Sequence, residues 1–204
     1  LGWLLVAAAG VIGLYLTYMT GIVTFLIGMA GLLIGYLYTA PPVRLVARRG
    51  LGELGIALAF GPLVTAGVVY VMTQQLDLMS FLIGLPVGLL TANILLINEF
   101  PDAASDATTG KNHLVVTFGK ERSTYIYLVI LLAAFITNLG IVYLLPDVNV
   151  WLLAVSTLSV VAGILIYRHI RRYYDSRELV TSNKRTIALS ALTGLFTALA
   201  LILG

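Results

Sequence analysis

The chain has 204 residues, of which 60% are hydrophobic and only 10% are charged, and its mean hydropathy is +1.02. Soluble domains carry about 25% charged residues, so this composition excludes an ordinary soluble protein and indicates an integral membrane protein. The net charge of +3 requires no nucleic-acid partner, because basic loops beside an anionic membrane surface account for it.

Seven apolar runs follow one another along the chain, each close to the roughly 20 helical residues that cross a bilayer core. In chain order they are Trp3–Met19, Gly21–Tyr38, Leu54–Met72, Phe81–Ile97, Tyr125–Leu145, Trp151–Tyr167 and Thr186–Leu203. Strands of a membrane barrel would instead alternate polar and apolar residues. The sequence therefore predicts an all-α membrane protein in which residues 1–204 form a single transmembrane domain. The glycines of GMAGLLIGY, residues 28–36, predict close packing between helices, because small residues let membrane helices approach.

The basic residues predict how these runs cross the membrane. All twelve lysines and arginines lie in three connections: Arg44, Arg48 and Arg49; Lys111, Lys120 and Arg122; and Arg168, Arg171, Arg172, Arg177, Lys184 and Arg185. The intervening connections, around Thr20, Thr73–Ser80 and Pro146–Val150, hold none. Basic loops stay on the cytoplasmic side, so the three basic connections and Leu1 are expected there.

The stretch NEFPDAASDATTGK, Asn98–Lys111, follows the fourth apolar run directly. On a helix, Asn98, Asp102 and Asp106 would step along one face, each about 6 Å above the last, so that their side chains can converge on one object. We expect Pro101 to loosen or restart the helix and Gly110 to end it in a left-handed conformation.

Two carboxylates and an amide oxygen are hard oxygen ligands, which suit Mg²⁺ better than zinc or copper. Magnesium usually binds through one or two carboxylates together with phosphate oxygens, so the implied ligand is a diphosphate. Lys111 and arginines of the other basic loops would hold the remaining phosphate oxygens. The alternative is that these residues are ordinary solvated charges at a membrane surface.

The same stretch, followed by HLVVTFG, resembles the second aspartate-rich motif of the UbiA-type intramembrane prenyltransferase superfamily. YTAPPVRL, Tyr38–Leu45, and GLGELGIALAFGPL, Gly50–Leu63, resemble the loop and following helix of its menaquinone branch. The resemblance extends in helix rhythm over essentially the whole chain.

The resemblance implies a bundle of nine transmembrane helices around a central cavity, with two aspartate motifs that bind Mg²⁺ and a prenyl diphosphate. Asp102 and Asp106 match the metal-binding and catalytic acids of the second motif. Asn98 matches the polar position one turn earlier, and Lys111 matches a diphosphate contact. Arg44 and Tyr38 are the further candidates for diphosphate binding, although the spacing of the arginine from the tyrosine differs from the common family pattern.

The first aspartate motif of the family is not in this sequence, since no acidic residue precedes Glu53. Seven runs instead of nine and a cytoplasmic Leu1 agree with this departure. We therefore expect the sequence to begin at the third family helix, lacking the first two helices and the first motif, and to hold half of an active site.

Other polar residues have structural interpretations at this stage. Glu53 is expected at a helix start, where an acid favours the helix dipole, and Glu99 is a possible assistant at the acidic site. His113 is expected to lie at the membrane interface, with substrate contact as the alternative. The arginines near Tyr173 are interpreted as topology anchors, and residues 114–118 as a short amphipathic segment that rests on lipid or caps the site.

The sequence thus predicts a Mg²⁺-dependent prenyltransferase that moves a polyprenyl group, such as geranylgeranyl, from its diphosphate to an acceptor near the cytoplasmic face. Among acceptors we favour a dihydroxynaphthoate-like aromatic, with a glycerol-phosphate ether lipid precursor (geranylgeranylglyceryl phosphate) as the first alternative. A cation-coupled transporter is the alternative from another class. Transporters commonly carry inverted repeats with helices broken near the midplane, and no convincing repeat is visible here.

Overall fold

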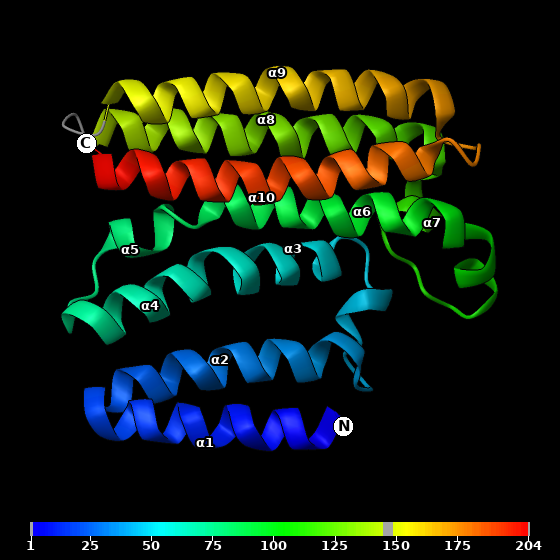
Figure 1. Ribbon diagram of the computed structural model, residues 1–204. Helices are drawn as coiled ribbons and strands as arrows, with labels where there is room; N and C mark the ends of the chain where they lie inside the picture. Colours follow the sequence, from blue (N-terminus) through cyan, green and yellow to red (C-terminus); the bar gives the residue numbers. More distant parts are fainter. Residues whose placement is uncertain (1, 145–148, 204) are drawn as a thin grey trace.

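The computed structural model describes residues 2–144 and 149–203, which are almost entirely helical (Figure 1). The elements are α1 (Gly2–Thr20), α2 (Ile22–Thr39), η1 (Leu45–Ala47), α3 (Leu51–Leu58), η2 (Ala59–Leu63), α4 (Val64–Thr73), α5 (Leu78–Leu82), α6 (Leu85–Thr108), α7 (Leu114–Phe118), α8 (Lys120–Leu144), α9 (Asn149–Tyr173) and α10 (Leu179–Leu203). No β-strand occurs within these two described ranges.

Six of the seven predicted membrane helices are confirmed. Six segments are long and apolar enough to cross a membrane: Ile22–Thr39, Leu51–Thr73, Leu78–Thr108, Lys120–Leu144, Trp151–Tyr173 and Leu179–Ile202. The first predicted run corresponds to a shorter apolar helix, Leu4–Thr20. The protein is therefore a multi-pass membrane protein. Leu1, Gly204 and most of the predicted connection around Pro146 lie outside the described residues.

The helices are arranged around α6 (Figure 1). Helices α3 and α4 lie between α2 and α6, and α8, α9 and α10 lie on the other side of α6. Buried side chains of α6, α8, α9 and α10 form the main hydrophobic core, in which Leu96, Ile97 and Tyr127 are fully buried. Burial of such large apolar side chains fixes α6 in position along most of its length.

The span from Leu51 to Thr73 is interrupted by one π-helical turn, η2, which contains Pro62. Proline lacks the backbone donor of a regular helix, and single π turns accommodate such defects. The same turn comes close to the backbone at the start of α6, since a Cβ placed on Gly61 would lie 2.6 Å from the carbonyl oxygen of Gly84, the residue before this helix. Glycine at this crossing therefore lets α3 and α6 pack together.

The predicted close packing at GMAGLLIGY is wrong. Helix α2 has no buried residue, and a Cβ placed on Gly28, Gly31 or Gly35 would meet no atom within 4 Å. Small residues permit close approach but do not specify where a partner lies, and here the approach occurs at η2 and α6 instead.

The three basic connections meet at one end of the bundle. The backbone N–H of Asn112 donates to the carbonyl of Ala47 at 3.3 Å, which joins the first connection to the second. Lys120 Nζ lies 2.6 Å from Asp175 Oδ1, which joins the second to the third. The arrangement agrees with the prediction that all three connections share one side of the membrane.

A buried interhelical hydrogen bond offers a simple test of this core. The hydroxyl of Tyr127 on α8, with no solvent exposure, lies 3.0 Å from Thr186 Oγ1 on α10. Tyr127→Phe is expected to lower the free energy of unfolding by about 0.6 kcal/mol, the average for such bonds in membrane proteins. Unfolding of the purified protein in mixed detergent micelles measures this, with Tyr143→Phe as the control because Tyr143 is 86% exposed. Equal stabilities of the two variants would contradict the hydrogen bond between α8 and α10.

Candidate functional site

Helix α6 carries all three polar residues of the predicted acidic face. It runs without a break from Leu85 to Thr108 and includes Pro101, so the expected loosening at this proline does not occur. Ile97 and Phe100, at 0% and 1% exposure, anchor the helix just before the proline. The loss of one backbone hydrogen bond is small beside this packing.

The three side chains have different partners. Asn98 Oδ1 accepts a hydrogen bond from the side-chain amide of Asn183 on α10. Asp102 is exposed and makes no side-chain hydrogen bond or ion pair within the part of the chain that the structure describes. Asp106 pairs with Lys111 and His113. Each step of four residues turns the face by about 40°, so that Asn98 and Asp106 differ by about 80° and point to different neighbours.

Gly110 ends α6 in a left-handed conformation, with φ of 73°, as predicted. The turn brings Lys111 back over the helix end, where its backbone N–H donates to the Asp106 carbonyl at 3.1 Å. Its Nζ donates to Asp106 Oδ1 at 2.8 Å, with the lysine side chain 36% and the aspartate side chain 15% exposed. The lysine and one carboxylate oxygen therefore lie together at the end of the bundle where the basic connections meet.

The loop that contains Arg44 packs beside this turn. Arg44 has a left-handed backbone and precedes η1, and the following Ala47 accepts the hydrogen bond from Asn112. The Arg44 side chain forms no hydrogen bond or ion pair with any described residue. Tyr38, half-buried at the end of α2, lies within electrostatic range of the Glu99 and Glu53 carboxyls. Both residues implied by the resemblance thus lie near the acidic end of α6.

Three buried ionisable residues form a cluster under this turn: Glu53, Glu99 and His113, with exposures of 4%, 7% and 2%. His113 Nδ1 lies 3.1 Å from Glu99 Oε2, and its Nε2 lies 3.2 Å from Asp106 Oδ2. The expected interfacial placement of His113 is wrong, because the loop folds inward onto α6. Glu53 lies in the first turn of α3 as predicted, but its Oε1 also accepts from the backbone N–H of Leu114 at 3.1 Å.

One sequence signal pointed to this cluster without identifying it. Glu99 precedes Asp106 by seven residues, which is about 20° around α6, and it is adjacent in sequence to the buried Phe100. An acid at such a position requires a buried partner. Which residue supplies it depends on the fold of the loop.

The segment 114–118 forms the short helix α7. Val115 is 1% exposed and packs into the core, whereas Phe118 is 46% exposed, which agrees with the predicted amphipathic character. The arginines in the last turn of α9 contact other surface groups: Arg171 Cζ lies 4.5 Å from the ring centre of Tyr125, and Arg171 Nη1 is 3.6 Å from Glu121 Oε1. These contacts fit the interpretation as a topology anchor.

The oxygen atoms at the end of α6 suit magnesium shared with a ligand. No group of three or more His, Cys, Asp or Glu side chains placed to hold a metal occurs within the described residues. The described residues therefore do not supply a complete set of protein ligands for a metal ion. Two carboxylates one turn apart, one of them without a partner among the described residues, match a hard cation that takes its other ligands from water and phosphate.

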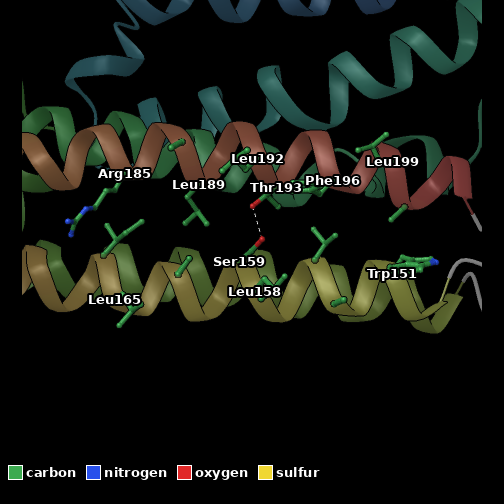
Figure 2. A pocket seen from close by; sticks show the side chains of 16 residues that line it. Trp151, Leu158, Ser159, Leu165, Arg185, Leu189, Leu192, Thr193, Phe196 and Leu199 are labelled. Carbon is green, nitrogen blue, oxygen red and sulfur yellow. Dashed lines mark hydrogen bonds between the residues drawn. The ribbon is translucent and has the colours of Figure 1, made fainter.

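Two apolar grooves lie away from these residues. One of about 910 Å³ runs between α9 and α10, with Arg185 towards one end and Trp151 at the other (Figure 2). The hydroxyls of Ser159 and Thr193, 2.8 Å apart, join the two helices along it. Arg185 leaves α10 about 200° around from Asn183, which contacts α6, so this groove opens away from the acidic face. The other, of about 700 Å³, lies among α1, α2 and α4.

Comparison with known proteins gives one family and several relatives. The model of the UbiA prenyltransferase family matches residues 1–192. The chain is 30% identical to 2-carboxy-1,4-naphthoquinone phytyltransferase of Synechocystis sp. over 160 residues, which is 78% of this chain and 50% of that protein. It is 29% identical to 1,4-dihydroxy-2-naphthoate octaprenyltransferase of Bacillus subtilis over 117 residues, 57% of this chain and 37% of that protein.

A third relative, the chloroplastic 2-carboxy-1,4-naphthoquinone phytyltransferase of Arabidopsis thaliana, is 27% identical over 208 residues, covering 96% of this chain and 53% of that protein. The chain spans about half the length, or less, of the curated relatives it matches. No solved structure matches significantly.

Proposed function

The chain belongs to the UbiA prenyltransferase family, and from this premise we propose that the protein transfers a polyprenyl group from a prenyl diphosphate to a naphthoate-type aromatic acceptor in the membrane. The observation that carries the proposal is the end of α6, where Asp102 and Asp106 lie one turn apart beside Lys111. This group of charges lies at the same end of the bundle as the three basic connections, which we assign to the cytoplasmic side.

Asp102 and Asp106 would bind magnesium, and the ion when bound would neutralise the charge that builds up on the departing diphosphate. Lys111 would turn from Asp106 to a phosphate oxygen, since its ammonium donates equally well to either anion. Arg44, in the adjacent loop, would supply a second donor to the diphosphate. Asn98, held by Asn183, and Tyr38 would line the same region. These contacts favour breakage of the carbon–oxygen bond at the allylic carbon, which an electron-rich ring carbon then attacks.

The acceptor is inferred from the relatives. Three matched proteins carry names that specify a dihydroxynaphthoate or a carboxynaphthoquinone. An aromatic acceptor also suits the proposed chemistry, because its ring supplies the electron pair for the new carbon–carbon bond. A glycerol-phosphate lipid acceptor would use the same diphosphate site, and the test below distinguishes it from the naphthoate.

The test uses the full-length protein, with any residues that precede Leu1, in lipid nanodiscs with geranylgeranyl diphosphate. With 1,4-dihydroxy-2-naphthoate we expect a prenylated product in Mg²⁺, none after chelation with EDTA, and recovery when Mg²⁺ is restored. Mass spectrometry of the extracted lipids measures the product. If a product forms with geranylgeranylglyceryl phosphate and not with the naphthoate, the lipid is the acceptor. Absence of Mg²⁺-dependent donor binding would refute the proposed function as a whole.

A further inference from the structure

The buried histidine beneath the acidic turn has no part in the proposed chemistry. His113 is 2% exposed and Glu99 is 7% exposed, although ionisable side chains are seldom buried without a specific partner. Both lie directly under Asp106, the acid nearest the end of α6. Their arrangement therefore concerns how that acid is held.

The two oxygens of Asp106 have different environments. Oδ1 faces the exposed Lys111 at 2.8 Å, and Oδ2 faces the buried His113 Nε2 at 3.2 Å. An ionised carboxylate paired with a lysine only accepts hydrogen bonds, so His113 Nε2 carries the proton and donates to Oδ2. One oxygen is thus fixed from the interior, and the other is left toward the surface where ligands arrive.

His113 is in turn held on its other side. Its Nδ1 accepts from the backbone N–H of Val116 at 3.4 Å, which caps the start of α7. Glu99 Oε2 lies 3.1 Å from the same nitrogen and makes no hydrogen bond within the described part of the chain. The neighbouring residue, Leu114, is tied to Glu53 of α3. The His113 ring is therefore held by α7, and the backbone of the loop is held by α3.

We propose that His113 is a positioning residue, which holds Asp106 Oδ2 so that Oδ1 is presented to magnesium and diphosphate when Lys111 turns away. The backbone N–H of Val116 fixes the His113 ring, and Glu53 fixes the loop against α3. Groups behind a metal ligand commonly orient it in this way, and their loss costs about 10–100-fold in metal affinity. This inference rests on the proposed function, and its test separates the two.

A purely structural role makes a different prediction, because capping α7 uses Nδ1 whereas positioning Asp106 uses Nε2. The amide nitrogen of glutamine reaches the place of Nε2, so His113→Gln keeps a donor to Asp106 and loses the cap. The amide group of asparagine reaches only the place of Nδ1, so His113→Asn keeps an acceptor for Val116 and loses the donor to Asp106.

The experiment measures the Mg²⁺ concentration that half-saturates geranylgeranyl diphosphate binding, together with Tm, for the full-length parent and both variants in nanodiscs. We expect His113→Asn to raise the half-saturating Mg²⁺ about 10–100-fold with little change in Tm. His113→Gln is expected to stay near the parent in Mg²⁺ dependence while its Tm falls.

Three results would overturn the proposal. The first is unchanged Mg²⁺ dependence in His113→Asn, and the second is a loss of Mg²⁺ affinity as large in His113→Gln as in His113→Asn. The third is a loss of Mg²⁺ affinity that is proportional to the fall in Tm in both variants. If His113→Asn does not fold, His113→Gln still decides, because retained affinity supports positioning and lost affinity contradicts it. If the parent shows no Mg²⁺-dependent binding of the diphosphate, the proposed function itself is refuted. If the parent binds and His113→Asn has the same Mg²⁺ dependence, only this inference is refuted.

Discussion

Asp102→Asn is expected to reduce prenyl transfer by about 100-fold or more while leaving Tm unchanged. Removal of a group that stabilises developing charge typically costs about 10²–10³ in rate. The fold should tolerate the change, because Asp102 is exposed and pairs with no described residue. Product formation and thermal unfolding of the full-length protein in nanodiscs measure the two effects.

Asp106→Asn is expected to cause a similar loss of activity and also to lower Tm, since it removes the ion pair with Lys111 and weakens the hydrogen bond from His113. Asp175→Asn is the matched control: it also loses a lysine partner, Lys120, but it lies on another connection and its side chain is 73% exposed. We expect this control to retain activity. Full activity in both α6 variants would mean that these acids are surface charges, and the proposed diphosphate site would be abandoned.

The features predicted correctly are those that depend on neighbouring residues. Membrane helices follow from the length of apolar runs, and the helix end at Gly110 follows from the freedom of glycine to adopt positive φ. The alignment of Asp102 with Asp106 follows from the geometry of one helix. Such features require no knowledge of which distant segments meet.

The buried cluster could not be predicted because it depends on segments far apart in the chain. Within it, Glu53 and Leu114 are 61 residues apart; outside it, the contact of Asn98 with Asn183 likewise joins residues 85 apart. Whether His113 reaches the interface or the interior depends on the direction in which its loop folds, and composition suggested the interface. Pro101 shows the same limit, since core packing around Phe100 outweighs the local tendency of proline to break a helix.

Gly88→Ala is expected to lower the free energy of unfolding by about 3 kcal/mol, at the upper end of the usual range for overpacking. A Cβ on Gly88 would collide with the carbonyl oxygen of Ala57 and lie 2.9 Å from Gly61 Cα. Both obstacles are backbone atoms, so no side chain can move aside and α3 must shift away from α6. Detergent unfolding measures the effect against Gly140→Ala on α8, where an added Cβ meets nothing within 4 Å.

The same substitution should weaken diphosphate binding although Gly88 lies far along α6 from the acidic turn. A displaced α3 would carry Glu53 away from Leu114, and the loop that holds His113 under Asp106 would lose its second anchor. We therefore expect Gly88→Ala to raise the half-saturating Mg²⁺ concentration as well as to destabilise the protein, whereas Gly140→Ala changes neither. Reduced stability with unaltered Mg²⁺ dependence would show that the contact between α3 and the loop is not needed to present Asp106, and that α6 alone holds the site in place.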